Sequence, residues 1–319
     1  MNILMITAND PAGMAIAFTN AINRYTEHRC RLITTAEKYG FGFEKDIHLP
    51  DIHDDDFGEV EQLLIDADII HFHVLTDEND SLGPITIRNF IRGKKIIHHH
   101  HGHPHFRANP EHYRNKYKRL RRRVLVSTPD LLRLLPEAHW VPNLVPIDDP
   151  LLKPRPSGTN GKVVIGQTPT RKELKNTAEL VEVVDELHKK SFSGNAIALK
   201  IIELLPHRQC LAEKNSCDII FDHMQGYYGV SSLESLSQGK PVIAGLDDWN
   251  IRCIKEFTGA AELPWQVARN EEELKDVLEK MICDRELRLK VGRASRTFME
   301  QHWTEQQALA VLLDVYKSL

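Results

Sequence analysis

The 319-residue sequence lacks several features that mark whole classes of protein. Its five cysteines are scattered and odd in number, and no CxxC pair occurs, which argues against a zinc knuckle or a redox dithiol. We therefore expect free thiols, as in a reducing compartment. No run of about 18 apolar residues is present, and the apolar start is too short for a signal peptide. We expect a cytoplasmic protein.

A surplus of charge of one sign is also missing. The 41 Lys and Arg residues against 45 Asp and Glu residues give a formal net charge of −4, which argues against a general nucleic-acid binder. The sequence has no GxSxG, GxxxxGK[ST] or GxGxxG motif, which removes serine hydrolases, P-loop proteins and ordinary dinucleotide binders. With 41% hydrophobic and 27% charged residues, it has the composition of an ordinary globular protein.

What the sequence does contain is an alternation of short apolar runs and helical segments. Strands alternating with helices are typical of a parallel sheet with helices on both faces, which binds ligands at the carboxyl ends of its strands. In the first half, strands are predicted at residues 2–7, 31–35, 69–74, 95–99 and 124–127, and helices at 14–24, 56–67 and 81–91.

The alternation stops at residues 140–161, which hold five of the sixteen prolines, and then resumes. Proline removes a backbone donor and fixes φ, so we expect a linker with little regular structure. Beyond it we predict strands at 163–166, 196–203, 217–222 and 241–244, and helices at 175–190, 231–238, 271–283, 285–301 and 304–319. This pattern predicts two doubly wound α/β domains, residues 1–146 and 147–303, facing a cleft.

The segment 226–246, GYYGVSSLESLSQGKPVIAGL, is more specific than a fold pattern. It resembles the donor-site segment of GT-B glycosyltransferases of the "glycosyl transferases group 1" type, which are retaining and family 4-like. In such a segment glycine lets the backbone approach a diphosphate, and the N–H groups of the first helical turn point at the anion. The resemblance implies that Gly229, Val230 and Ser231 cradle the diphosphate and that Glu234 accepts hydrogen bonds from the ribose.

Further segments resemble the same family. Residues 164–177 resemble the first strand, loop and helix of its donor domain, where a basic pair grips the diphosphate; Arg171, Lys172 and Lys175 are the candidates. Cations gathered near a helix start favour an anionic ligand, because the helix dipole alone would disfavour them. We expect base contacts from the loop around residues 205–208, including Leu205. Residues 126–146 and 289–303 also match, and the family's last helix packs back on the first domain, here residues 304–319.

Six histidines crowd residues 98–105. On a strand, His98 and His100 face one side while His99 and His101 face the other, so a single site uses half of them at best. Zinc needs ligands that converge, and we expect no metal here, with most of these histidines packed or solvated. The resemblance places His101 near the reacting sugar.

Two other features of the first domain leave alternatives open. Asp10 and Gly13 lie in the loop after the first strand, which in this fold touches the acceptor, although a plain turn with a helix start is equally consistent. Residues 113–123 carry seven Lys or Arg. They form either a solvated helix face or a docking surface for an anionic membrane or a phosphorylated acceptor.

The resemblance implies an enzyme that moves a sugar from a nucleoside-diphosphate sugar to the hydroxyl of a glycan, a lipid-linked or another acceptor, in the synthesis of cell-surface glycans. Basic side chains and helix N–H groups would stabilise the leaving diphosphate, so no cofactor or metal is expected. Gly226 stands where many members carry a glutamate that contacts the donor sugar. The alternatives are another GT-B enzyme, such as a nucleotide-sugar epimerase, and an inactive nucleotide-sugar-binding protein.

Overall fold

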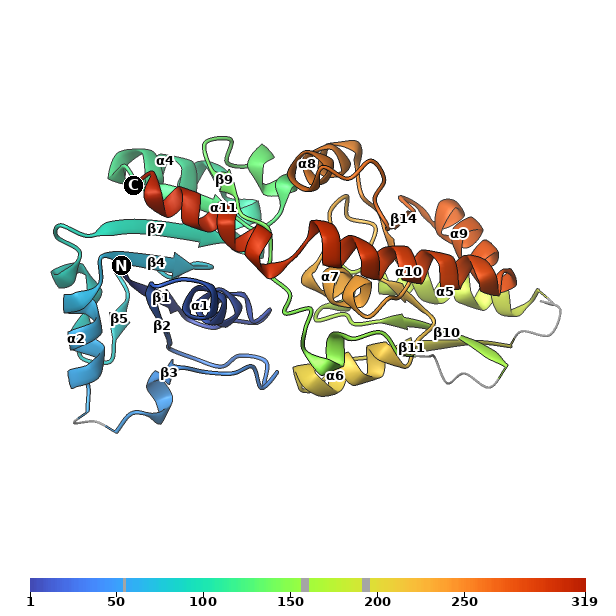
Figure 1. The fold of residues 1–319 in the computed structure, drawn as a ribbon, viewed down its shortest axis with the longest axis horizontal. Coiled ribbons are helices and arrows are strands. Elements are labelled where there is room, and N and C mark those ends of the chain that lie inside the picture. The colour runs from blue at the N-terminus through green and yellow to red at the C-terminus, as the bar shows by residue number, and fades with distance from the viewer. Residues whose placement is uncertain (54–55, 156–160, 191–195) are drawn as a thin grey trace. The chain divides into compact units, whose positions relative to one another are not determined.

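The computed structural model describes residues 1–53, 56–155, 161–190 and 196–319. The chain divides into two compact units, which we call unit 1 (Met1–Leu144 with Glu305–Leu319) and unit 2 (Val145–Thr304). Each unit is built on its own parallel sheet (Figure 1). The first unit therefore ends at residue 144, where the sequence predicted 146.

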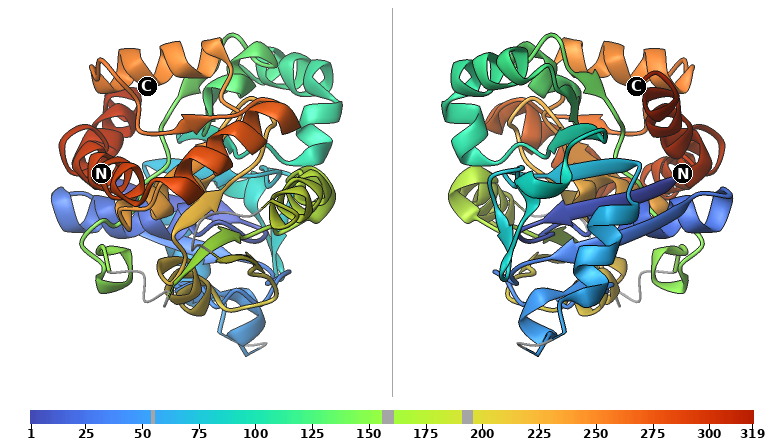
Figure 2. Two further views of the ribbon diagram at one scale, coloured as in Figure 1. Left: turned by 90° about the vertical axis from the view of Figure 1, so that its right-hand side faces the viewer. Right: turned by 90° about the vertical axis from the view of Figure 1, so that its left-hand side faces the viewer.

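The sheet of unit 1 is parallel and has the strand order β3-β2-β1-β4-β7-β8-β9. Its long inner strands are nearly continuous apolar runs, as burial on both faces requires. The blue and cyan strands lie side by side in Figure 2. The bounds are β1 (Asn2–Thr7), β2 (Arg29–Thr34), β3 (Ile47–His48), β4 (Ile69–His73), β7 (Lys95–His100), β8 (Arg123–Val126) and β9 (His139–Trp140).

Helices cover both faces of this sheet. On one face, α1 (Met14–Tyr25) and α11 (Glu305–Lys317) form a core with the strands, in which Phe18 and Leu312 are fully buried. The predicted return of the last helix to the first domain is therefore confirmed. The other face packs against α2 (Gly58–Asp66) and, further along, α3 (Pro104–Ala108) and α4 (Pro110–Leu120).

The helix predicted at residues 81–91 is wrong. The chain there forms a small antiparallel pair, β5 (Ser81–Leu82) and β6 (Ile85–Thr86), followed by a short 3₁₀ helix, Ile87–Phe90. Gly83 turns the chain with φ of 60°, in the left-handed region that favours glycine, and Pro84 follows it. Gly-Pro is a strong turn signal, and here it outweighs the helical spacing of the apolar residues.

Unit 2 repeats the design with a parallel sheet of order β11-β10-β12-β13-β14. Its strands are β10 (Lys162–Gln167), β11 (Ala196–Ile201), β12 (Ile219–Phe221), β13 (Val242–Ala244) and β14 (Gln266–Val267). Its helices are α5 (Thr177–His188), α6 (His207–Asn215), α7 (Val230–Ser237), α8 (Asp248–Thr258), α9 (Glu271–Cys283) and α10 (Arg285–His302). The predicted α/β class is confirmed, whereas α6 and α8 were not predicted.

The predicted linker is irregular where it is described. Residues 141–149 have neither helix nor strand, and a single 3₁₀ turn, Pro150–Leu152, follows. The polar Ser-Gly-Thr-Asn-Gly patch lies almost wholly outside the described residues. All five cysteines are free, as predicted. Within the described ranges, no helix has both the length and the apolar character that crossing a membrane requires.

Candidate functional site

The first turn of α7 lies against a lysine–aspartate pair at the end of β12. Asp222 directly follows that strand and is buried; its Oδ1 accepts from Lys175 Nζ at 2.9 Å. Its Oδ2 accepts from the backbone N–H of Gly229 at 2.6 Å and from the Ser232 hydroxyl at 2.7 Å. Burial opposes ionisation, but His223, Lys175 and these hydrogen bonds outweigh it and hold the pKa of Asp222 below its usual value.

Gly229 is required here by close approach. A Cβ atom at this position would lie 3.1 Å from Lys175 Nζ and 3.3 Å from both carboxylate oxygens of Asp222. The N–H of Gly229 is engaged by Asp222, but those of Val230 and Ser231 have no hydrogen-bond partner among the described residues. Two N–H groups of the predicted diphosphate cradle, those of Val230 and Ser231, are therefore unpaired within the described part of the chain, at the start of α7 and close to Lys175. Such an arrangement suits an anion.

The other two predicted cations lie elsewhere on unit 2. Arg171 Nε donates to Glu173 at 2.9 Å, and Lys172 Nζ donates to Glu203 at 2.8 Å. Both side chains are about half exposed. Of the three predicted cations, Lys175 alone reaches Gly229.

Glu234 is buried and engaged within its own unit. Its Oε1 lies 2.6 Å from His207 Nε2, and its Oε2 accepts from Lys214 Nζ at 2.5 Å. Lys214 is fully buried and also lies 3.2 Å from the hydroxyl of Ser231. Burial opposes the charge, but Lys214 and His207 lower the pKa of Glu234 to about 2. A carboxylate has about four acceptor sites, so these two contacts do not use its full acceptor capacity.

Sequence reasoning missed two residues of this region, Asp222 and Lys214, whereas His207 lies in the predicted base-contact loop. An acid placed directly after a buried strand was a usable signal for Asp222. Lys214 was missed because α6, which carries it, was not predicted.

In the predicted base-contact loop, Leu205 is half-buried just before α6. His207 and Arg208 already belong to α6 and contact Glu234 and Asp149.

In unit 1, His101 follows β7, and its Nε2 lies 3.0 Å from Nδ1 of His73. Burial lowers the pKa of His101 to about 4, so its ring is neutral at pH 7. The predicted alternation is confirmed. His98 points to the opposite face, 3.2 Å from a Glu78 oxygen, and His100 lies 2.6 Å from the Tyr117 hydroxyl.

In the loop between β1 and α1, Asp10 and Gly13 help to form the start of α1. Asp10 accepts from the backbone N–H of Met14 at 2.9 Å and of Ile16 at 3.0 Å, which holds the first turn of α1. Gly13 has φ of 65° and precedes that helix. Burial raises the pKa of Asp10 to about 6, although the N–H bonds oppose the change. A contact of Asp10 and Gly13 with an acceptor stays a prediction.

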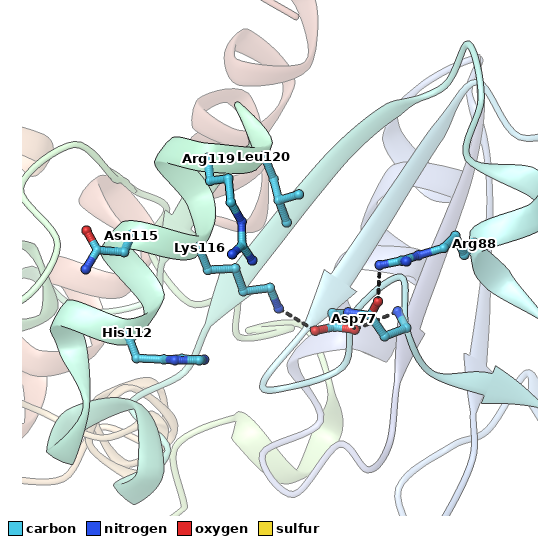
Figure 3. Close-up of a pocket in the computed structure, with 8 residues that line it drawn as sticks. Asp77, Arg88, His112, Asn115, Lys116, Arg119 and Leu120 are labelled. Atoms are coloured by element: carbon cyan, nitrogen blue, oxygen red, sulfur yellow. Dashed lines mark hydrogen bonds and ion pairs between the residues drawn. The ribbon is translucent and has the colours of Figure 1, made fainter.

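The basic segment, residues 113–123, is only partly a free surface. Tyr113 and Tyr117 are buried, Arg122 pairs with Glu78, and Lys116 pairs with Asp77. Lys116 and Arg88 point from two sides toward the loop of Asp77, at an open pocket of about 460 Å³ (Figure 3). The pocket is lined by Asp77, Asn79, Arg88, His112, Asn115, Lys116, Arg119 and Leu120. Lys118, Arg119 and Arg121 are exposed.

No family model and no curated protein matches the sequence. Solved structures do match, at low identity. HepE of Anabaena in complex with UDP-glucose superposes with a TM-score of 0.68 at 13% identity, over 99% of this chain and 100% of that one. A glycosyltransferase from Rickettsia africae ESF-5 gives 0.65 at 13% identity, over 99% and 98%.

A third similar structure is a UDP-GlcNAc 2-epimerase from Neisseria meningitidis bound to UDP-GlcNAc, with a TM-score of 0.52 at 13% identity over the full length of both chains. At such identities the likeness shows the fold alone. Two parallel-sheet units, with the last helix returned to the first, together with these likenesses show that the chain has the GT-B fold.

Proposed function

We propose that the protein is a retaining glycosyltransferase that moves a sugar from a nucleoside-diphosphate sugar to an acceptor hydroxyl. The observation that carries the proposal is the position of Lys175 Nζ beside the first turn of α7. A lysine and the open N–H groups of Val230 and Ser231 together suit a diphosphate. The GT-B fold supports the same class, since HepE of Anabaena binds UDP-glucose and the Rickettsia protein is a glycosyltransferase.

The chemical task is to stabilise the charge that develops on the leaving diphosphate. Lys175 would supply a cation held in place by Asp222, and α7 would supply N–H groups that need no reorganisation. Arg171 and Lys172 contact Glu173 and Glu203 instead of the start of α7, so Lys175, which lies beside Gly229, carries the main role. These groups would do the work without a metal or cofactor at the diphosphate.

The remaining site roles follow from the resemblance. Glu234 would accept from the ribose while Lys214 and His207 fix its position. Leu205 would contact the base. In unit 1, the neutral ring of His101 would hydrogen-bond the donor sugar, and Asp10 and Gly13 would meet the acceptor. Exposed Lys118, Arg119 and Arg121 would attract an anionic membrane surface or a phosphorylated, lipid-linked acceptor in the cytoplasm.

Calorimetry with UDP, GDP and ADP tests the proposal. Lys175→Ala should weaken binding of the preferred nucleotide by about 1.5–3 kcal/mol, because it removes one charge-assisted contact. Lys172→Ala is the matched control. Lys172 lies three residues from Lys175, is exposed and pairs with Glu203, so we expect this variant to bind the nucleotide as tightly as the unaltered chain. Equal affinity of Lys175→Ala and Lys172→Ala, both folded, would refute the assignment.

A nucleotide-sugar epimerase is the second candidate, favoured by the likeness to the Neisseria enzyme. An epimerase converts the donor with no acceptor present, whereas a transferase does not. Product analysis of UDP-GlcNAc incubated with the protein alone should show no epimer and, in D₂O, no deuterium in the sugar. Binding without turnover across a panel of acceptors would instead indicate an inactive binding protein.

A further inference from the structure

Histidine rings from two neighbouring strands stack within unit 1. His71 and His73 alternate along β4, and His99 lies on β7, paired in register with His73. Their ring centroids are 4.4 Å apart for His71 and His73, 5.4 Å for His71 and His99, and 5.3 Å for His73 and His99. All three side chains are buried, on the sheet face that α1 and α11 cover.

The nitrogens of these rings are poorly satisfied. Among the residues that the structure describes, Nε2 of His71, Nε2 of His73 and both ring nitrogens of His99 have no hydrogen-bond partner. Buried polar atoms in folded proteins are nearly always paired, and a group of unpaired ones calls for a ligand or ion. Three buried imidazoles from two strands therefore present free acceptor or donor atoms to one small volume.

We propose that His71, His73 and His99 bind a divalent transition-metal ion inside unit 1. One ring nitrogen from each of the three lies within 4.8 Å of the others. Imidazole nitrogen is a preferred ligand of zinc, copper, nickel and iron. At metal–nitrogen distances of about 2.0–2.1 Å, tetrahedral ligand nitrogens lie about 3.4 Å apart, so the stacked rings have to rotate until their nitrogens converge on the ion. Three ligands leave a fourth position open.

The outer nitrogens of two of these rings already have partners. Nδ1 of His71 lies 2.7 Å from the hydroxyl of Tyr316 on α11, and Nδ1 of His73 lies 3.0 Å from Nε2 of His101. Histidine ligands usually donate from the second nitrogen, which fixes the tautomer and the ring orientation. Metal binding through Nε2 would make Nδ1–H the donor in both cases, and would orient His101 through His73.

The charged clusters of unit 2 play no part in this site, so it stands independently of the proposed sugar transfer.

Metal titration of the full chain tests the site. After chelator treatment, the protein should bind one Co²⁺ per chain with visible ligand-field absorption, and Zn²⁺ should displace it. His99→Asn should abolish this absorption. The matched control is His100→Gln. His100 is the next residue on β7 and is equally buried, but it faces Tyr117, so this variant should still bind Co²⁺. Tyr316→Phe removes the partner of His71 and should weaken binding by about 10- to 100-fold.

Circular dichroism checks the folding of each variant. If His99→Asn does not fold, His71→Gln and Tyr316→Phe decide the question in the same titration. The proposal is overturned if the unaltered chain binds no stoichiometric ion. It is equally overturned if binding survives the folded cluster variants and disappears instead when His103 and His105, outside the stack, are replaced.

Discussion

Each unit buries a cluster of polar side chains at the strands of its parallel sheet, but the two clusters differ in charge and in hydrogen bonding. Unit 1 stacks neutral imidazoles whose nitrogens are largely unpaired. Unit 2 buries full charges, and each one has partners: Glu234 contacts Lys214 and His207, and Lys214 also contacts Ser231. A buried charge needs an opposite charge or hydrogen bonds inside the protein, whereas a neutral ring can be buried with unpaired nitrogens at a smaller cost.

The comparison is tested most strongly by removing one side chain from each cluster. Lys214→Ala leaves Glu234 with His207 as its remaining side-chain partner, and should destabilise unit 2 by about 3–5 kcal/mol. His99→Phe in unit 1 removes a neutral imidazole whose two ring nitrogens have no hydrogen-bond partner among the described residues, and should cost no more than about 1–2 kcal/mol. Urea unfolding measures both. Tryptophan fluorescence reports mainly on unit 2, which holds Trp249, Trp265 and Trp303. Circular dichroism follows both units, so unfolding that it detects without a fluorescence change belongs to unit 1. Equal costs would remove the distinction between charged and neutral clusters.

A second prediction concerns acid. The pKa of Glu234 is lowered from 4.5 to about 2 in the folded chain, so its contribution to stability is present above about pH 4.5 and is lost as the pH falls toward 2. At about 1.4 kcal/mol per pKa unit the loss is on the order of 3 kcal/mol. Denaturant midpoints between pH 5 and pH 2.5 measure it.

The control is Glu234→Gln, which has no carboxyl to titrate and should show a shallower decline over the same pH range. The same variant separates the two roles of this residue. If Glu234 also accepts from the ribose, UDP affinity at pH 7 should fall by about 1–3 kcal/mol. A lower melting temperature with unchanged affinity would reduce Glu234 to a structural ion-pair partner.

The smallest change in stability is expected at residues near the clusters. In each unit a non-glycine residue there has a backbone conformation in the left-handed region. Val74 directly follows His73 with φ of 61°, and Leu204 lies just before α6 with φ of 57°. Leu204 is 94% exposed, so it packs against little, and Leu204→Gly should raise stability by up to about 1 kcal/mol. Val74 is half-buried, so Val74→Gly should gain less or lose. Thermal melts of the two variants compare them; a larger gain at Val74 would contradict this account.

Local sequence signals predicted most of the regular elements because burial on both faces makes the strands apolar and short. The strand at residues 2–7 and the helix at 271–283 agree residue by residue with β1 and α9. The failures have physical causes. Helix α6, HRQCLAEKN, has little apolar periodicity, and the turn at Gly83 competed with a helical pattern.

The candidate site was less predictable than the fold because it depends on contacts distant in sequence. Nothing near Lys175 indicates that Asp222, 47 residues away, would hold it while Lys172 pairs with Glu203. The histidine stack was missed for the same reason. Residues 98–105 drew attention by their density, whereas the partners His71 and His73 are two unremarked residues in another strand.

The position of α11 has a consequence for how the chain is made. Unit 1 is encoded in two pieces separated by all of unit 2, and the second piece supplies Leu312 and Tyr316 to its core. At about 5–20 residues per second, a ribosome needs on the order of ten seconds to translate residues 145–304 between them. During that interval the sheet face of the nascent unit 1 that α11 will cover stays open to water. The face is covered only when residues 305–317 emerge and dock, so unit 1 completes its core after unit 2 has been made.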